Sequence, residues 1–175
     1  PGTLEVLYPG SLERTPYWEN LPGGENYLGS VFCFKETELD PWSPFHVDVR
    51  PGTLGIMEWQ SSHYDTTMSL PDGLRYIGPD AFPDGMYELV DFTLPESVTY
   101  IDHEAGVPIS AVRDLPDALT YIGMNAFESD YQIDIGYLEI PNGVKYIGQK
   151  AFAHINTGSS QKMDVRLPDS LEYMD

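Results

Sequence analysis

The chain repeats one pattern, Leu115-Pro-Asp-Ala-Leu-Thr-Tyr-Ile-Gly123, and this repetition decides its fold. The other copies keep Pro, an aliphatic residue, Tyr and Ile or Met at the same offsets: Leu70-Pro-Asp-Gly-Leu-Arg-Tyr-Ile-Gly78, Leu94-Pro-Glu-Ser-Val-Thr-Tyr-Ile-Asp102, Ile140-Pro-Asn-Gly-Val-Lys-Tyr-Ile-Gly148 and Leu167-Pro-Asp-Ser-Leu-Glu-Tyr-Met-Asp175. The starts lie 24, 21, 25 and 27 residues apart. A sustained short period is typical of a solenoid, in which each repeat forms one coil and the stacked coils share one core.

Each coil is predicted to contain a short strand just before its proline. These runs alternate in polarity and contain β-branched and aromatic residues, as half-buried strands do: 66–70, 90–94, 136–140 and 163–167. The core-facing members would be Met68 and Leu70, Phe92 and Leu94, Leu138 and Ile140, and Val165 and Leu167. Stacking the coils would pair these strands side by side in one broad sheet.

Two further positions complete the predicted coil. A glycine closes three of the copies, where we expect it to supply positive φ: Gly78, Gly123 and Gly148. A phenylalanine follows in an Ala-Phe pair and should plug the middle of the coil: Phe82, Phe127 and Phe152. We expect Phe127 and Phe152 to be almost fully buried.

The two ends of the chain differ from the regular repeats. Residues 1–48 are interpreted as degenerate repeats or an N-terminal cap, and 49–175 as the repeat array, because only fragments such as Pro51-Gly-Thr-Leu54 keep the pattern before position 70. At the other end, Leu171 and Met174 would have no following coil to cover them. An open solenoid end exposes apolar surface and a strand edge, so we expect either that the natural protein continues or that this end self-associates.

The repeat resembles the BspA-like leucine-rich repeat family of bacterial surface proteins, whose unit reads roughly Ile-Pro-x-x-Val-x-x-Ile-Gly-x-x-Ala-Phe. The resemblance covers 66–175 well and 1–65 poorly. It implies a right-handed, β-rich (α/β-type) leucine-rich repeat solenoid with short or irregular helical turns. It also implies a secreted or cell-surface protein without enzymatic activity. The coil that begins at Leu94 departs from the pattern, with Gly106 at the phenylalanine position.

Composition excludes several classes of partner. The net charge of −19 disfavours nucleic acid and anionic lipid, which need clustered Lys and Arg. No apolar run is long enough to span a membrane. Cys33 is the only cysteine and lies between two phenylalanines, which favours a small buried hydrophobe over a nucleophile. The acidity itself has two interpretations, solubility or attraction of Ca²⁺ or a basic partner.

No motif in the sequence predicts catalysis, a metal centre or a cofactor. The four histidines are unpaired at helical spacing: His46, His63, His103 and His154. The run Ser62-His63-Tyr64-Asp65 has the residue types of a catalytic triad, but triads are assembled from separate segments. The acidic loop 128–134 matches no calcium-binding spacing. We therefore expect no enzyme, no metal and no cofactor.

Binding is instead predicted on the solvent-facing side of the strands, for a protein or glycan outside the cell. The residues of this strip are Thr67, Ser69, Asp91, Thr93, Asp114, Tyr137, Glu139, Asp164 and Arg166. A second candidate is the column of tyrosines at one offset, which is either a packing ladder or a platform for a ligand: Tyr76, Tyr100, Tyr121, Tyr146 and Tyr173.

The irregular coil 102–114 offers His103 and Glu104, and Arg113 falls where an apolar residue is expected unless a bulge turns Val112 inward. The alternative function is a carbohydrate-binding accessory of polysaccharide uptake. It would use exposed aromatics such as Trp18, Trp42 or Trp59.

Overall fold

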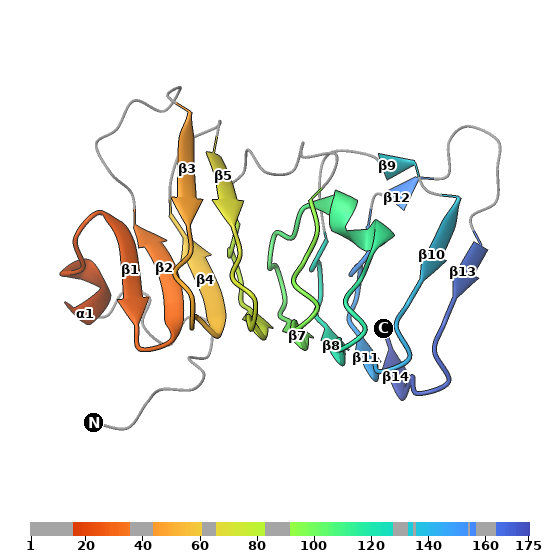
Figure 1. Cartoon of the computed structure of the whole chain (residues 1–175). Coiled ribbons are helices and arrows are strands. Elements are labelled where there is room, and N and C mark those ends of the chain that lie inside the picture. The colour runs from red at the N-terminus through yellow and green to blue at the C-terminus, as the bar shows by residue number, and fades with distance from the viewer. Residues whose placement is uncertain are drawn as a thin grey trace.

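The computed structural model describes residues 16–35, 44–60, 66–82, 92–127, 133–134, 136–153, 155–156 and 164–175. These segments form a β-solenoid in which successive coils stack from one end of the molecule to the other (Figure 1). The predicted solenoid is therefore confirmed. Among these described segments the α-helix is a single turn, α1 (Pro16–Glu19), and a 3₁₀ helix, η2 (Ile109–Arg113), lies in the middle of the stack.

The tyrosine-isoleucine and tyrosine-methionine pairs of the repeat supply the strands of the principal sheet from β6 onward. Its order is β1-β2-β4-β6-β7-β8-β11-β14. The strands are β1 (Gly24–Leu28), β2 (Val31–Lys35), β4 (Gly55–Trp59), β6 (Tyr76–Ile77), β7 (Tyr100–Ile101), β8 (Tyr121–Ile122), β11 (Tyr146–Ile147) and β14 (Tyr173–Met174). All neighbours are parallel except the hairpin β1–β2 at the N-terminal end.

Among the described residues, the runs before each proline do not form the broad sheet that their alternation predicts. They make two separate parallel pairs, β3 (Phe45–Asp48) with β5 (Thr66–Ser69), and β10 (Tyr137–Glu139) with β13 (Asp164–Arg166). A third pair joins β9 (Ile133–Asp134) to β12 (Ile155–Asn156). Two coils intervene. The described residues 92–95 of the first form no strand, and the second has η2, which Pro108 precedes, in place of a strand.

The core-facing positions are as predicted in the middle of the stack but not at its end. The buried members are Met68, Leu94, Leu138 and Ile140. Two others, Leu70 and Phe92, are half-buried. Val165 and Leu167 are each 46% exposed, so the prediction is wrong for the last described coil. The reason is that a coil at the end of a stack has a neighbour on one side only.

The phenylalanine plugs show the same end effect. Phe82 and Phe127 are buried, and the Phe127 ring stacks on Phe152 with 5.3 Å between centroids. Phe152 itself is only half-buried, contrary to the expectation that it would be fully enclosed. Its stacking partner lies in the preceding coil.

The repeat glycines are needed for space rather than for positive φ, which corrects the sequence-based expectation. Gly78, Gly123 and Gly148 all lack positive φ, and the left-handed residue lies two positions later, for example Asn125 with φ 53°. A Cβ at Gly148 would lie 2.5 Å from the backbone nitrogen of Met124, inside van der Waals contact. The glycines therefore let the backbones of adjacent coils approach closely.

The N-terminal hairpin closes one end of the principal sheet. Cys33 on β2 is fully buried, as predicted, and burial raises the pKa of its thiol to about 12. The Phe34 ring stacks on Trp59 at 4.1 Å between centroids. Within the segments that the structure describes, no helix is long and apolar enough to cross a membrane.

Candidate interaction surface

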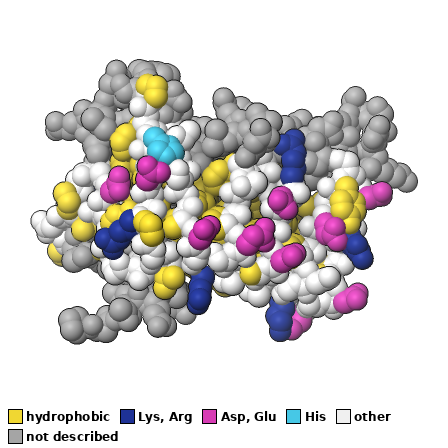
Figure 2. Space-filling model, viewed as in Figure 1, with side chains coloured by type: hydrophobic (Ala, Val, Ile, Leu, Met, Phe, Trp, Pro, Cys, Tyr) yellow, Lys and Arg dark blue, Asp and Glu magenta, His cyan; other side chains and the backbone are white. Residues whose placement is uncertain are grey.

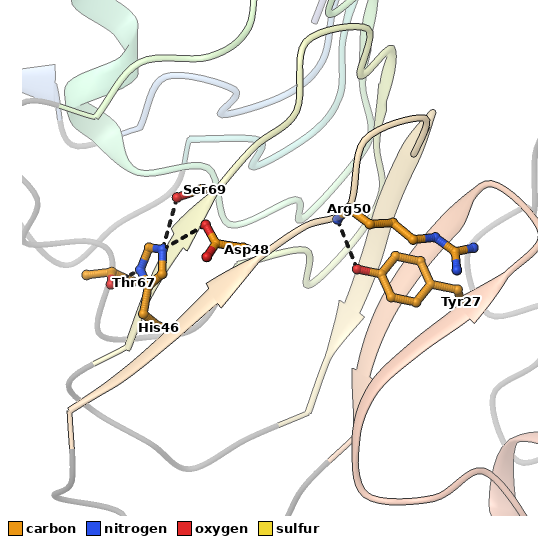
Figure 3. A network of polar contacts seen from close by, with 6 residues as sticks. All are labelled: Tyr27, His46, Asp48, Arg50, Thr67 and Ser69. Carbon is orange, nitrogen blue, oxygen red and sulfur yellow. Dashed lines mark hydrogen bonds and ion pairs between the residues drawn. The ribbon is translucent and has the colours of Figure 1, made fainter.

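The predicted binding strip divides into two patches on the strand side, with η2 between them (Figure 1). The first patch lies on β3 and β5, where Thr67 and Ser69 are joined by His46 (Figure 3). The Nδ1 atom of His46 lies 2.6 Å from Thr67 Oγ1, and its Nε2 lies 2.9 Å from Ser69 Oγ and 3.2 Å from Asp48 Oδ1. His46 and Asp48 are not among the predicted surface residues, because their coil lacks the clear repeat that would have placed them.

This first patch sets one imidazole among two hydroxyls and a carboxylate. In a triad the carboxylate and the nucleophile contact opposite nitrogens of the imidazole, so that one orients the ring while the other loses a proton. Here Asp48 and Ser69 share Nε2, and Thr67 is the hydroxyl on the opposite nitrogen, Nδ1. The His46 and Asp48 side chains are 49% and 82% exposed, so the cluster is open to water and can exchange hydrogen bonds with a ligand.

The second patch lies on β10 and β13 and contains the exposed tyrosine of the strip. Tyr137 is 48% exposed, and Glu139, Asp164 and Arg166 are exposed beside it. Arg166 Nη1 lies 3.1 Å from Glu139 Oε1. The hydrogen bond with Tyr137 and the charge of Glu139 raise the pKa of the Arg166 guanidinium. The arginine contacts these two neighbours while its side chain remains 70% exposed.

The remaining strip residues lie between the patches. Thr93 and Asp114 are exposed, and Asp91 lies outside the described residues. In the irregular coil Val112 is buried and Arg113 is exposed. Val112 therefore turns inward, which was one of the alternatives for this coil, and a 3₁₀ helix rather than a strand bulge produces the turn.

The tyrosine column forms the ladder that the repeat predicts. Successive ring centroids from Tyr76 to Tyr173 lie 5.6, 4.2, 4.5 and 5.2 Å apart, and the rings are stacked. Stacking turns each inner ring face against its neighbour, so the inner rings offer edges and hydroxyls rather than faces. A sugar needs a free ring face to stack on, and this geometry favours the packing interpretation.

The tyrosine ladder should make the stability of the fold sensitive to high pH. Burial raises the pKa of Tyr121, and its hydrogen bond with Tyr100 lowers it by a smaller amount. Because the raised pKa favours the protonated phenol, this contribution to stability is complete below the unfolded-state pKa of about 10 and is lost as pH rises through the folded-state value. The free energy of unfolding measured in urea should fall as pH rises above that value. It should fall less steeply in Tyr121→Phe than in the unmodified protein. Tyr137→Phe is the control, since that ring stands outside the ladder, and equal slopes for the two variants would contradict the expectation.

A polar cluster interrupts the glycine column beside the ladder. Asp102 stands where the neighbouring copies have glycine, and it is buried. It accepts a hydrogen bond of 2.7 Å from the Tyr76 hydroxyl, and its other oxygen lies 2.8 Å from His103 Nδ1. His103 and Glu104 are exposed. The cluster thus ties two coils together and leaves an imidazole at the surface.

Other candidate residues lie elsewhere. Trp59 is buried against Phe34, so the expectation that it is an exposed sugar-binding aromatic is wrong. The side chain of Trp18 lies outside what the structure describes. The same holds for the whole of Trp42, the run 62–65 and most of the acidic loop 128–134. In the described part of the chain, no three His, Cys, Asp or Glu side chains gather closely enough to hold a metal ion.

The repeat itself has counterparts among known families. The sequence pattern of the BspA type leucine rich repeat region matches residues 58–174, in six copies. The chain belongs to this family. No curated protein and no solved structure matches it. The BspA-type family is generally surface-associated, and its repeats form protein-binding or adhesion modules, typically without catalysis.

Proposed function

We propose that this BspA-type chain is a non-catalytic adhesion module that binds a partner protein outside the cell through its strand side. The observation that carries the proposal is Tyr137, a large aromatic ring that is 48% exposed on β10. Tyrosine is favoured at the energetic centres of protein interfaces. Glu139 and Arg166 beside it form an ion pair that supplies donors and acceptors at the rim.

The glycan alternative has less support from the side chains. Sugar-binding sites use aromatic faces that are free to stack, and neither Trp59 nor the inner rings of the tyrosine ladder presents one. Figure 2 shows that carboxylates outnumber basic side chains on the face that it displays. Such a surface favours a partner with positive charge over a neutral polysaccharide.

Replacing Tyr137 with alanine should weaken binding by about 1–2 kcal/mol, which is roughly 5- to 30-fold. Folding should hardly change, because the side chain points to solvent. The test measures binding of the purified chain to immobilised extracellular-matrix proteins and, in parallel, to a glycan array. Arg166→Ala should add to the loss.

The matched control is Tyr173→Ala, because Tyr173 is a comparably exposed tyrosine on the other sheet, 52% exposed. It should leave binding intact. If Tyr137→Ala and Arg166→Ala leave binding unchanged but Tyr173→Ala abolishes it, the site lies on the tyrosine ladder instead. Binding on the glycan array alone would favour the carbohydrate accessory.

A further inference from the structure

An asparagine and a glycine lie side by side in a turn between β10 and β11. Pro141 begins this turn, and its carbonyl accepts a hydrogen bond of 3.0 Å from the Val144 N–H, so Asn142 and Gly143 are the two central residues. Asn142 is exposed and Gly143 is half-buried. An asparagine followed by glycine is chemically reactive, because glycine has no Cβ to shield its backbone nitrogen from the asparagine side chain.

Both reacting groups are free of hydrogen bonds within the part of the chain that the structure describes. The Asn142 side chain makes none, and neither does the Gly143 N–H. The equivalent turn of an earlier repeat differs, because the Gly73 N–H donates to Ser97 Oγ at 3.0 Å. The nitrogen of Gly143 can therefore approach the amide carbon of Asn142 without first breaking a hydrogen bond.

The other asparagines do not combine these features. Asn20 and Asn26 donate their side-chain amides to backbone carbonyls, and Asn26 is also buried. Asn125 is half-buried with a left-handed φ of 53°, and alanine follows it. The side chain of Asn156 lies outside what the structure describes. Among the asparagines whose side chains are described, Asn142 alone is exposed, unbonded and followed by glycine.

Reaction between the two groups needs water and no cofactor. The Gly143 nitrogen attacks the side-chain carbonyl carbon of Asn142, forms a new C–N bond and expels ammonia, which carries away the Gly143 amide proton. The product is a cyclic imide, a succinimide. Water then opens the ring at either carbonyl, and the two openings give aspartate or isoaspartate. The net change converts an amide and water into an acid and ammonia, with no oxidation or reduction.

The same offset of the repeat carries a carboxylate in the other clear copies. Conversion would give position 142 the residue type of its counterparts, all of which are exposed: Asp72, Glu96, Asp117 and Asp169. The coils of Asp117 and Asp169 lie on either side, because β11 pairs with both β8 and β14. The modified chain would therefore gain a negative charge in a row that is already acidic, at a turn that accepts aspartate in other coils.

The turn also adjoins the patch around Tyr137, since β10 ends at Glu139 just before it. Asp169 occupies in its coil the offset that Asn142 occupies in the preceding one. The pKa of Arg166 is raised mainly by its hydrogen bond with Tyr137 and, to a smaller extent, by charges that include Asp169. A carboxylate at this offset thus acts on the patch, and one at position 142 would add negative charge beside it.

We propose that Asn142 and Gly143 form a spontaneous modification site, at which the folded protein slowly loses ammonia and gains a carboxylate beside the Tyr137 patch. The chemistry stands on the turn alone. Its consequence rests on the proposed function, because the added charge strengthens the attraction of the patch for a positively charged partner. Modification would then tune binding as the protein ages.

The chemical test incubates the folded full chain in heavy-oxygen water at neutral pH and maps its peptides by mass spectrometry. We expect heavy oxygen at position 142, while Asn20 and Asn26, whose amides are hydrogen-bonded, stay unmodified. A more acidic species should accumulate on ion exchange. It should be absent from Asn142→Gln, because glutamine closes the corresponding larger ring far more slowly.

A synthetic peptide of residues 138–146 supplies the reference rate for an unfolded chain. Intact Asn142 in the folded protein, after this peptide has fully converted, would show that the turn blocks the reaction and that the proposal is wrong. Equal modification of Asn20 and Asn142 would also overturn it, because the reaction would then be independent of the turn.

The binding test compares fresh and aged chain on immobilised extracellular-matrix proteins. Aged chain should bind a basic matrix protein about two- to fivefold more tightly, the effect of one exposed charge, and fresh Asn142→Asp should reproduce the gain. Binding by Asn142→Gln should not change with age. Equal binding by fresh and fully converted chain would refute the effect on the patch. If no matrix protein binds, the proposed function fails, whereas the mass measurement still decides whether the site reacts.

Discussion

Adding one methyl group at Gly123 should destabilise the folded protein by about 3 kcal/mol, the upper end of the usual cost of overpacking. The Cβ of Gly123→Ala would land on the backbone of Asp102 and His103 in the preceding coil. Backbone cannot rotate away as a flexible side chain can. Relief requires the two coils to separate, which would strain the Gly123 N–H bond to Ile101 and part the stacked rings of the ladder.

The matched control is Gly136→Ala, in a position where a Cβ meets nothing within 4 Å. Gly136 is exposed, and its φ is not positive. This variant should be neutral or slightly stabilising, by up to about 1 kcal/mol, because alanine restricts the unfolded chain. Urea denaturation followed by circular dichroism compares the two. Similar unfolding midpoints would show that the coils are not in backbone contact at Gly123.

The features that recur in every copy could be predicted from the sequence. The tyrosine ladder follows from one offset repeated five times, because stacked coils must bring equal offsets together. The burial of Leu138 and Phe127 follows for the same reason. These predictions need only the period and the polarity of the residues.

The contacts between particular coils could not be predicted in this way. A coil's own sequence contains two strand-like runs, and which run pairs with the next coil depends on how closely the backbones approach. At one interface that approach requires Gly123, because a Cβ there would meet the backbone of Asp102 and His103. The sequence pattern shows that glycine recurs at this position. It does not show whether glycine is required by the lack of space for a Cβ or by a positive φ. The polar cluster at His46 was missed because its repeat is degenerate.

The position of a coil in the stack also affects how much a core residue contributes. Phe127 has no exposed surface, and it lies between the coils on either side of it. Phe127→Ala should therefore cost about 3–5 kcal/mol, through the lost transfer energy and the cavity left behind. The loss should appear as a lower unfolding midpoint in urea, with the slope of the transition nearly unchanged.

Phe152→Ala is the internal comparison, because it deletes the same ring at the same repeat position. Phe152 is half-buried, and its ring packs on Phe127. Part of the ring already contacts solvent, so its removal forfeits less transfer energy and leaves a site that water can enter. We expect a cost of about 1–2 kcal/mol, roughly half that of a fully enclosed phenylalanine. Equal costs for the two variants would mean that Phe152 is covered in solution, by another chain or by further repeats, and light scattering on the unmodified protein would then distinguish an associated chain from a monomer.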